Sequence, residues 1–321
     1  MLNESKVRAT LVLLVYQQRQ WVEDAVTACF NQDCEKIEII LSDDASDDGS
    51  YEVMLDLAER YKGKHTVRVR KNDKNLGIGE HYNRVIGESL GELIITAAGD
   101  DISLPNRVDE LLKAWDGTGQ KADLISSYMS DMTMTGEIVG PKFVSDLSLW
   151  DKPEKWTRKR PHVIGASHAF TKRMHDFFGP FDADLAYEDQ VMAFRASCLG
   201  GGVTVKKVLL NYRRGGVSSK RKGTETFDSY ISQKYKKYDR QRVVFGQIRA
   251  DMFRAQLDHL WVGKVKNYYL KSEFILKIIK EKHYFNMIRL AFENHQAGFF
   301  WVYKEAVRHI LNCIRLQKSL A

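Results

Sequence analysis

Short apolar runs alternate with amphipathic segments along the first third of the chain. The run ATLVLLVY at 9–16 is almost wholly apolar, as in a parallel strand that is buried on both faces. The pattern predicts four strands and four helices: strands at 9–16, 37–42, 66–70 and 93–98, and helices at 21–30, 51–61, 80–90 and 105–115. Such repeated strand-helix units favour an α/β fold with an open, mostly parallel, doubly wound, Rossmann-like sheet.

The middle of the chain is less regular, and its end is helical. The pattern predicts strands at 123–129 and 203–212 and a helix at 187–199. Near the end, apolar residues at 299–315 recur every three or four positions, with basic residues on another face. We therefore expect one domain over 1–225 and a helical, basic, amphipathic region over 226–321.

The positive charge of the chain lies in its last segment. The formal net charge is +7. From Val262 to the end there are 11 Lys and Arg against 4 Asp and Glu, a difference of +7, so the rest of the chain is neutral. This asymmetry indicates an anionic partner for the tail, which is a membrane surface, a nucleic acid or an acidic protein. The alternative is that its apolar stripe packs on the first domain or on a second copy of the chain.

Several classes of protein are disfavoured by the sequence. The four cysteines form no CxxC pair and have no histidine cluster nearby, which disfavours a structural zinc site and is typical of reduced cytosolic thiols. No apolar signal core begins the chain, and no uncharged apolar run reaches the roughly 18 residues that a membrane-spanning helix needs. We expect a cytoplasmic protein.

Two acid clusters follow predicted strands. Asp43 and Asp44 end the second strand, and Asp100 and Asp101 follow the fourth. The carboxyl ends of parallel strands form the ligand site of doubly wound sheets. A divalent metal that holds a diphosphate would use one or two carboxylates there, and a base or ribose would donate to others. The alternative is that these acids cap turns and helices.

Three further segments have residue types that suit a phosphate or a hydroxyl substrate. Gly77 and Gly79 precede a helix, where backbone N–H groups can approach phosphate, although no P-loop follows. Glu188 and Asp189 begin a helix, where acids are favoured by the dipole or serve as a general base. The segment NYRRGGVSSKRKG at 211–223 is either a solvated charged loop or a diphosphate-binding loop.

Taken in order, these segments resemble the family 2 glycosyltransferases of the GT-A fold. The motifs that carry the resemblance are the strand ending in Tyr16, then EIILSDDASDDGS, NLGIGEHYNRVI, GDDISLPNRV, FGPFDADLAYEDQVMAFR and YRRGGVSS. They cover about residues 7–220. Two positions depart from the family pattern: Gln17 stands where Asn is usual, and Ala98 stands where the metal motif usually has its first Asp.

The resemblance implies a set of donor-binding residues. Tyr16 and Asp44 would hold the nucleobase, with Asp43 beside them, and Asn75 and Gly77 would shape the floor of the nucleotide site. The remaining donor contacts would be with the sugar, the ribose and the diphosphate, through Asp100, Arg213, Arg214 and Ser218.

The resemblance also implies a metal site and a catalytic base. Asp101 would bind Mn²⁺ or Mg²⁺ directly, Asp189 would deprotonate the acceptor hydroxyl, and Glu188 would support the acceptor. The implied enzyme is a metal-dependent, inverting glycosyltransferase of surface polysaccharide synthesis. Its donor would be a nucleoside-diphosphate sugar, most naturally a UDP-sugar, and its acceptor a glycan or a polyprenyl-diphosphate-linked glycan.

Two other functions compete with this one. A nucleotidyltransferase that makes a nucleotide sugar also needs a metal and strand-end acids, but YQQRQW after the first strand is a poor phosphate loop. A nucleic-acid-binding protein would use the basic tail, but the sequence contains no recognised nucleic-acid motif. We therefore expect no nucleic-acid partner, a peripheral location at the inner face of the cell membrane, and either a single copy or a homo-oligomer.

Overall fold

The computed structural model describes residues 7–215 and 227–280, together with 289, 307, 308, 310 and 311. Two compact units are present, Met1–Lys220 and Arg221–Ala321. Ser218, predicted to contact the donor, lies outside the described residues, as does most of the amphipathic segment at 299–315.

The sheet of the first unit begins with four parallel strands. Their spatial order is β3 (Thr66–Lys71), β2 (Glu38–Asp43), β1 (Ala9–Val15) and β4 (Leu93–Ala98). Every residue of β1 and β2 is buried, which is why their apolar runs show no alternation. Because β2, β1 and β4 run parallel, they end at the same edge of the sheet, and each is followed by a loop with polar residues.

The second half of the sheet is mixed. β8 (Ala169–Thr171) is antiparallel to both β4 and β6 (Leu124–Met132), and β6 runs parallel to β9 (Gly202–Arg213). Two short strands complete it: β5 (Ile102–Ser103) pairs with β9, and β7 (Ile138–Lys142) pairs with β6, both antiparallel. The α/β class with a helical C-terminal region is thus confirmed, while the parallel arrangement is confined to β1–β4 and the β6–β9 pair.

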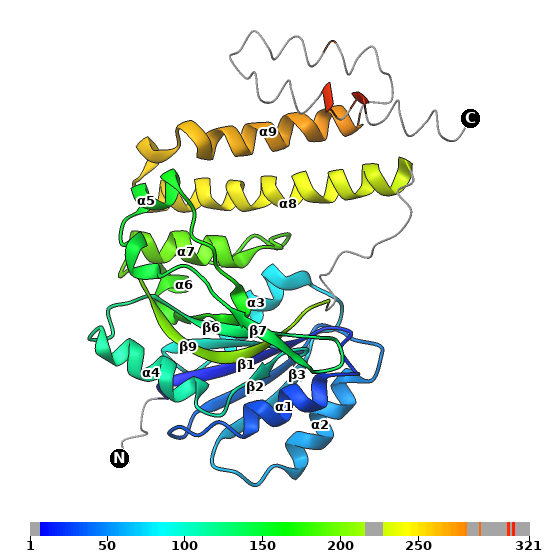
Figure 1. Ribbon diagram of the computed structural model, residues 1–321, viewed down its shortest axis with the longest axis vertical. Coiled ribbons are helices and arrows are strands. Elements are labelled where there is room, and N and C mark those ends of the chain that lie inside the picture. Colours follow the sequence, from blue (N-terminus) through cyan, green and yellow to red (C-terminus); the bar gives the residue numbers. More distant parts are fainter. Residues whose placement is uncertain (1–6, 216–226, 281–288, 290–306, 309, 312–321) are drawn as a thin grey trace. The chain divides into compact units, whose positions relative to one another are not determined.

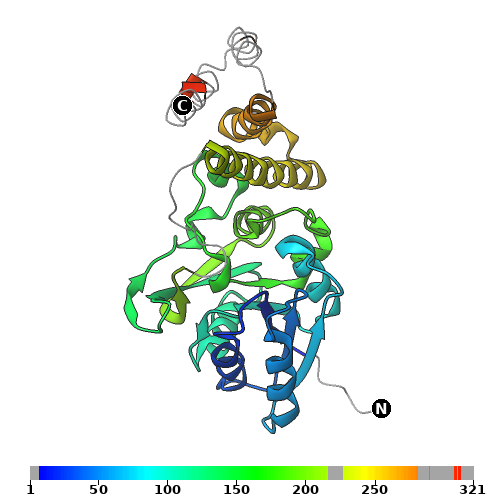
Figure 2. The same ribbon diagram turned by 90° about the vertical axis from the view of Figure 1, so that its right-hand side faces the viewer.

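Helices cover both faces of this sheet (Figures 1 and 2). On one face lie α1 (Val22–Phe30), α2 (Ser50–Arg60) and α4 (Arg107–Gly117), whose apolar side chains share one core with alternate residues of β1, β2 and β4. On the other lie α3 (Gly77–Glu88), α6 (Lys172–Phe178) and α7 (Glu188–Cys198). Tyr82 of α3 packs against Phe170 and Phe181 on that side.

The eight elements predicted in the first third are all present, with ends that differ by no more than a few residues. The predicted strands at 123–129 and 203–212 and the helix at 187–199 correspond to β6, β9 and α7. Not predicted were the short elements of the middle region: β5, β7, β8, α5 (Pro153–Arg158), α6 and the 3-10 turns at Leu147–Trp150 and Gly165–Ser167.

The second unit contains two long helices, α8 (Phe227–Arg254) and α9 (Gly263–Lys280), joined through a 3-10 turn at Asp258–Leu260. They pack on each other through a small apolar core that includes Tyr238, Phe274 and Ile275. Among the described residues, no helix combines the length and the apolar composition that crossing a membrane requires.

Candidate active site

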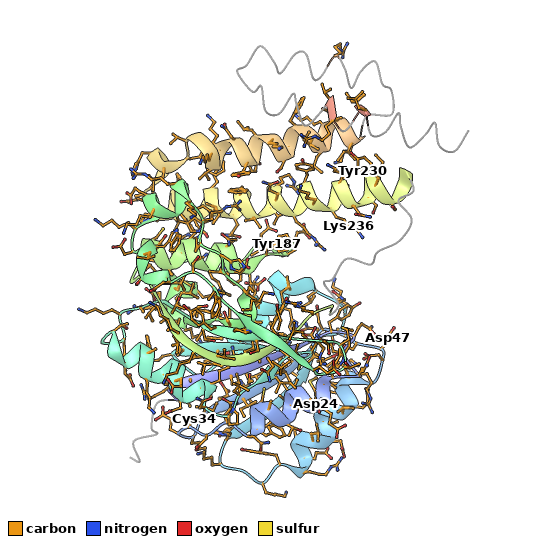
Figure 3. The ribbon with its side chains drawn as sticks, viewed as in Figure 1. Asp24, Cys34, Asp47, Tyr187, Tyr230 and Lys236 are labelled. Carbon is orange, nitrogen blue, oxygen red and sulfur yellow. The ribbon has the colours of Figure 1, made fainter. Side chains whose placement is uncertain are left out.

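The loops after β1, β2 and β4 meet at one edge of the sheet. Figure 3 places Asp47, which follows β2, at the opposite end of the sheet from Cys34, which precedes it. At this edge the turn Ala98–Asp101 is held by backbone hydrogen bonds, from Gly99 to Leu14 and from Asp101 to Ala98. A Cβ on Gly99 would come within 2.5 Å of the Gln18 Oε1 atom and 2.9 Å of a Val15 methyl carbon, so a larger residue would displace these side chains.

Asp101 is a buried acid, and one of its two carboxylate oxygens has no hydrogen-bond partner. Its Oδ1 accepts a hydrogen bond of 2.8 Å from the backbone N–H of Arg213, whereas its buried Oδ2 has no partner. Burial, and then the neighbouring Asp100, raise the pKa of Asp101 to about 8. Burial also raises the pKa of Asp100. A cation that shared these carboxylates would satisfy the orphaned oxygen.

The residues present therefore fit a divalent metal only in part. Within the described ranges, no group of three or more His, Cys, Asp or Glu side chains could hold a metal ion. Ala98, which ends β4, offers no third carboxylate. A metal at Asp100 and Asp101 would need further oxygen ligands from a bound diphosphate and water, which is how Mg²⁺ is commonly held.

Arg213 holds the turn at Ala98–Asp101 in place. Its Nε donates to the carbonyl of Asp100 at 2.8 Å, and its Nη1 donates to the carbonyls of Thr133 and Met134 at 3.1 and 2.9 Å. The guanidinium also lies over the ring of Trp21, 5.6 Å from its centroid. The side chain that the sequence assigned to a diphosphate is thus buried and engaged with backbone carbonyls.

A second buried cation, Arg107, lies behind the same turn. It is fully buried on α4 and donates to Ser103 Oγ and to the carbonyls of Thr96 and Ala166, at 2.8, 2.6 and 2.7 Å. Burial lowers the pKa of Arg107 to about 10, and Asp101 opposes that shift. Sequence reasoning missed this residue, although Arg107 continues the buried stripe of Leu111 and Trp115 at intervals of four.

Asp44 organises the loop before α3. Its Oδ1 accepts from the Asn72 side chain at 2.7 Å and from the backbone N–H of Leu76 at 2.9 Å, and its Oδ2 accepts from the N–H of Gly77 at 3.0 Å. The Asn75 side chain also accepts from the Gly77 N–H, at 2.9 Å. Gly77 has φ +75°, a left-handed conformation that favours glycine. Asp44, Asn75 and Gly77, which were predicted to bind the nucleotide-sugar donor, thus form one hydrogen-bond network.

The loops after β1 and β2 are bonded to each other. Gln17 donates its backbone N–H to Ser46 Oγ at 2.9 Å and its side-chain amide to Asp47 at 2.6 Å. Its φ is 56°, so it occupies a left-handed conformation in which Asn is several-fold enriched. That preference gives a physical reason for the Asn that the family usually has at this position.

Tyr16, the neighbour of Gln17, is partly exposed. The buried Asp43 accepts a hydrogen bond from the Ser46 N–H, and its other carboxylate oxygen has no partner.

Glu188 and Asp189 are the first two residues of α7, and their carboxylates accept few hydrogen bonds. Burial, and then Asp189, raise the pKa of Glu188 to about 8. Burial raises the pKa of Asp189 to about 6, although the Gln190 N–H at 2.7 Å, His162 and Arg160 favour its ionised form. The close approach of Glu188 requires a glycine, since a Cβ on Gly165 would lie 2.3 Å from Glu188 Oε1.

The charges of acids from both regions, the strand ends and α7, act on Tyr212. It precedes Arg213 on β9, and Asp131 is its register partner on β6. Burial raises the pKa of Tyr212, and so do the charges of Asp101, Asp100, Asp131 and Asp189, in that order. Asp100 and Asp101 at the strand ends and Asp189 of α7 are therefore all near enough to Tyr212 for their charges to raise its pKa.

Asp131 was not singled out from the sequence, and it holds two cations beside Tyr212. Lys142 Nζ lies 3.0 Å from Asp131 Oδ1, and Arg214 pairs with Asp131 Oδ2. Lys142 also lies over the ring of Tyr212, 4.7 Å from its centroid. Arg214 itself is more than half exposed. It remains accessible to an anionic ligand, unlike Arg213.

Comparisons with curated proteins find relatives among glycosyltransferases. The chain is 27% identical over 215 residues to EpsH of Bacillus subtilis, which covers 64% of this chain and 60% of EpsH, so the matched part is less than two thirds of that protein. It is 20% identical over 219 residues to an Escherichia coli protein named UDP-Gal:alpha-D-GlcNAc-diphosphoundecaprenol beta-1,3-galactosyltransferase, covering 68% of this chain and 78% of that protein.

Solved structures share the fold. The crystal structure of Staphylococcus aureus TarS residues 1–349 matches with a TM-score of 0.58 and 15% identity, covering 94% of this chain and 81% of that one. The mannosyltransferase PcManGT of Pyrobaculum calidifontis, solved with GDP-Man and Mn²⁺, matches with a TM-score of 0.54 and 12% identity over 98% of this chain and 87% of that one.

The sequence model of one family matches half of the chain. It is the model of glycosyl transferase family 2, and it matches residues 10–171, from the first buried strand to the end of β8. This range contains the strand-end acids and the turn at Ala98–Asp101 described above. The chain belongs to glycosyl transferase family 2.

Proposed function

We propose that this protein is a metal-dependent, inverting glycosyltransferase that uses a nucleoside-diphosphate sugar. The observation that carries the proposal is the buried Asp101 at the edge of the sheet, with one carboxylate oxygen bonded to the Arg213 N–H and the other without a partner; the charges of Asp101, Asp100 and Asp189 also act together on Tyr212. In this proposal one acid pair would hold the donor diphosphate and its metal, and the other would take the proton of the acceptor hydroxyl. A transferase needs both within reach of one anomeric carbon.

The donor would be held by the loops at the carboxyl ends of the strands. Tyr16, Asp43 and the network around Asp44 would bind the nucleobase and ribose. Asp100 would contact the ribose or donor sugar, and Arg214 would contact the diphosphate together with the glycine- and serine-rich segment that includes Ser218. Asp101 would bind Mn²⁺ or Mg²⁺, whose charge, when it is bound, stabilises the leaving nucleoside diphosphate. Arg213 would keep the turn in its binding geometry.

The acceptor would be activated by Asp189. A hydroxyl within hydrogen-bonding distance of its carboxylate would lose its proton as the oxygen forms a bond to the anomeric carbon. The bond to the diphosphate oxygen breaks on the opposite face, so the configuration inverts. A pKa of about 6 suits this task, because the carboxylate is ionised at neutral pH and is more basic than an exposed aspartate.

A UDP-sugar and a lipid-linked acceptor are the favoured substrates. The Escherichia coli relative is named for a UDP-galactose donor and a diphosphoundecaprenol-linked acceptor, and one TarS structure was solved with UDP-GlcNAc. An acceptor with a polyprenyl chain would bring the enzyme to a membrane surface.

A thermal-shift screen tests the donor and the metal together. UDP-, GDP- and dTDP-sugars are added to the full chain with and without Mn²⁺, followed by assay of nucleoside diphosphate release. We expect one nucleotide to stabilise the protein only with Mn²⁺, and Asp101→Ala to lose that response. Release of pyrophosphate from a nucleoside triphosphate and a sugar phosphate would contradict the proposal.

A further inference from the structure

The carboxylate of Asp44 is the last member of a series of hydrogen bonds that begins on β3. Arg70 of β3 donates from Nη2 to Asn72 Oδ1 at 2.7 Å. Asn72 in turn donates from Nδ2 to Asp44 Oδ1, also at 2.7 Å. Asn72 and Asp44 are buried, and the side chain of Arg70 is 17% exposed. Three polar groups therefore connect the edge strand of the sheet with the carboxylate at which the nucleobase is proposed to bind.

These contacts fix the direction in which the Asn72 amide faces. A guanidinium can only donate hydrogen bonds, and a carboxylate can only accept them. Asn72 must therefore turn its oxygen toward Arg70 and its NH₂ group toward Asp44. The reversed amide would place donor against donor and acceptor against acceptor, and both bonds would be lost at buried polar groups.

Two further contacts hold Arg70 itself. Its Nη1 donates to Ser42 Oγ at 2.7 Å, and its Nε donates to Glu88 Oε1 at 3.1 Å. Ser42 is fully buried, and its Oγ lies 2.6 Å from Nε2 of the buried His81. Burial lowers the pKa of His81 to about 4, so the ring is neutral at pH 7 and can accept a hydrogen bond from Ser42. All three nitrogen atoms of the guanidinium thus have an acceptor, which fixes its plane.

Asp44 keeps one acceptor position for a ligand. Each carboxylate oxygen can accept two hydrogen bonds. Oδ1 accepts from Asn72 and Leu76, and Oδ2 accepts from Gly77. Among the described residues no second donor bonds to Oδ2, so an N–H group of a ligand can bind there. The two oxygens belong to one rigid carboxylate, and the Asn72 amide therefore helps to set the direction of Oδ2.

We propose that Arg70 is a positioning residue of the nucleotide site, which acts through Asn72 to aim Asp44 at an N–H group of the nucleobase. Arg70 does not touch the ligand in this role. It orients the amide, and the amide orients the carboxylate. The bases that fit have a ring N–H, as uracil, thymine and guanine do and as cytosine and adenine do not. This inference rests on the proposed function, in which the nucleobase binds at Asp44.

Discrimination between nucleotides tests this role. Calorimetric titration of the full chain with Mn²⁺ present compares UDP with CDP and GDP with ADP, since only one member of each pair has the ring N–H. We expect the parent to bind that member of one pair at least about tenfold more tightly, and Arg70→Gln to lower this preference by about tenfold. Asn72→Ala should lower it equally, and the double variant no further, because Arg70 acts through Asn72.

Arg68 provides a matched control. It lies two residues earlier on β3, and it donates to the buried Glu38 carboxylate and to the Glu88 carbonyl, both at 2.7 Å. Arg68→Gln should leave the nucleotide preference unchanged. Glu88→Gln is a milder variant, since its amide oxygen can still accept from Arg70, and it should lower the preference by about twofold. The inference is wrong if Arg70→Gln discriminates like the parent, if the Arg70 and Asn72 effects add, or if Arg68→Gln shows the same loss.

A measurement without ligand separates this inference from the proposed function. The side-chain NH₂ signals of Asn72 are assigned in NMR spectra of the full chain by their loss in Asn72→Asp. In Arg70→Gln we expect these signals to move and to exchange with solvent about tenfold faster, and in Arg68→Gln to stay in place. Unchanged signals in Arg70→Gln overturn the inference. Failure to bind any nucleoside diphosphate, with the NMR result intact, would instead overturn the proposed function.

Discussion

The acids at the strand ends and the acids at the start of α7 are held in different ways. Asp44 accepts hydrogen bonds from three donors, and Asp101 accepts one from the Arg213 backbone. Asp189 accepts from the adjacent Gln190 N–H, and Glu188 lies against Gly165. Three donors fix the position of Asp44, whereas burial raises the pKa of Asp101, Glu188 and Asp189 alike. In the proposed mechanism the strand-end acids position the donor and Asp189 acts as the base, so that the two roles are divided between the two regions.

The largest expected effect is at Asp189. Asp189→Asn removes the base but keeps the size of the side chain, so we expect transfer to fall by about 10³-fold, the scale of general base catalysis. Donor affinity, measured by calorimetry, should stay within twofold. Asp184→Asn, an exposed change in the preceding loop, is the control and should retain parental activity. Equal loss in both variants would contradict the division of roles.

Arg107 connects the two regions, because it bonds to Thr96 on β4 and to Ala166 beside Gly165. Arg107→Met would leave buried acceptors unpaired, and we expect it to lower the free energy of unfolding by about 3 kcal/mol. Urea unfolding of the full chain measures this change. Arg84→Met on the exposed face of α3 is the control and should cost under about 0.5 kcal/mol. Similar costs for the two variants would contradict a structural role for Arg107.

The affinity of the protein for Mn²⁺ should depend on pH. The folded pKa of Asp101 is about 8, above its ordinary value of 3.8. Without metal, its contribution to stability is present below about pH 4 and is lost as the pH rises through 8. Metal binding needs the ionised form, so Mn²⁺ affinity should rise by about tenfold per pH unit from 6 to 8 and then level off. Thermal shifts at fixed Mn²⁺ measure this. An affinity that does not change with pH would show that Asp101 is not a ligand.

The smallest effect is expected at Asp44. In Asp44→Asn a single amide oxygen replaces two carboxylate oxygens, so either the Asn72 amide and the Leu76 N–H lose their acceptor, or the Gly77 N–H keeps only its bond to Asn75. We expect nucleotide affinity to fall by about tenfold, equivalent to about 1.4 kcal/mol. Calorimetric titration with the nucleotide from the screen gives the value. Asp73→Asn, exposed in the same segment, should not change it. Affinity equal to the parent in Asp44→Asn would contradict this assignment.

The sequence was most informative where burial is uniform. Strands such as β1 and β4 are continuous apolar runs, so their positions and the acids that follow them could be predicted. β5 and β8 span two and three residues and are too short to show a period. Their placement depends on pairing with β9, β4 and β6, which lie far away in the chain.

The residues of the candidate active site could likewise be predicted only where local sequence patterns mark them. Asp44, Asn75 and Gly77 were predicted to bind the nucleotide-sugar donor. They form one hydrogen-bond network because they lie near each other in the sequence or on adjacent loops. Arg107 and Tyr212 depend in part on contacts with elements more than 50 residues away, such as Ala166 for Arg107. No local pattern encodes such contacts, although an arginine on the apolar stripe of α4 is a usable signal.

The pH dependence of the transfer rate tests the central claim most directly. Single turnovers are followed from pH 5 to 8 with saturating donor and metal, in the parent and in Asp189→Asn. The parent rate should be constant above about pH 6 and fall by about tenfold per unit below it, because protonation removes the base. The residual rate of Asp189→Asn should show no such step. A parent rate without the step, or the same step in both proteins, would contradict Asp189 as the catalytic base.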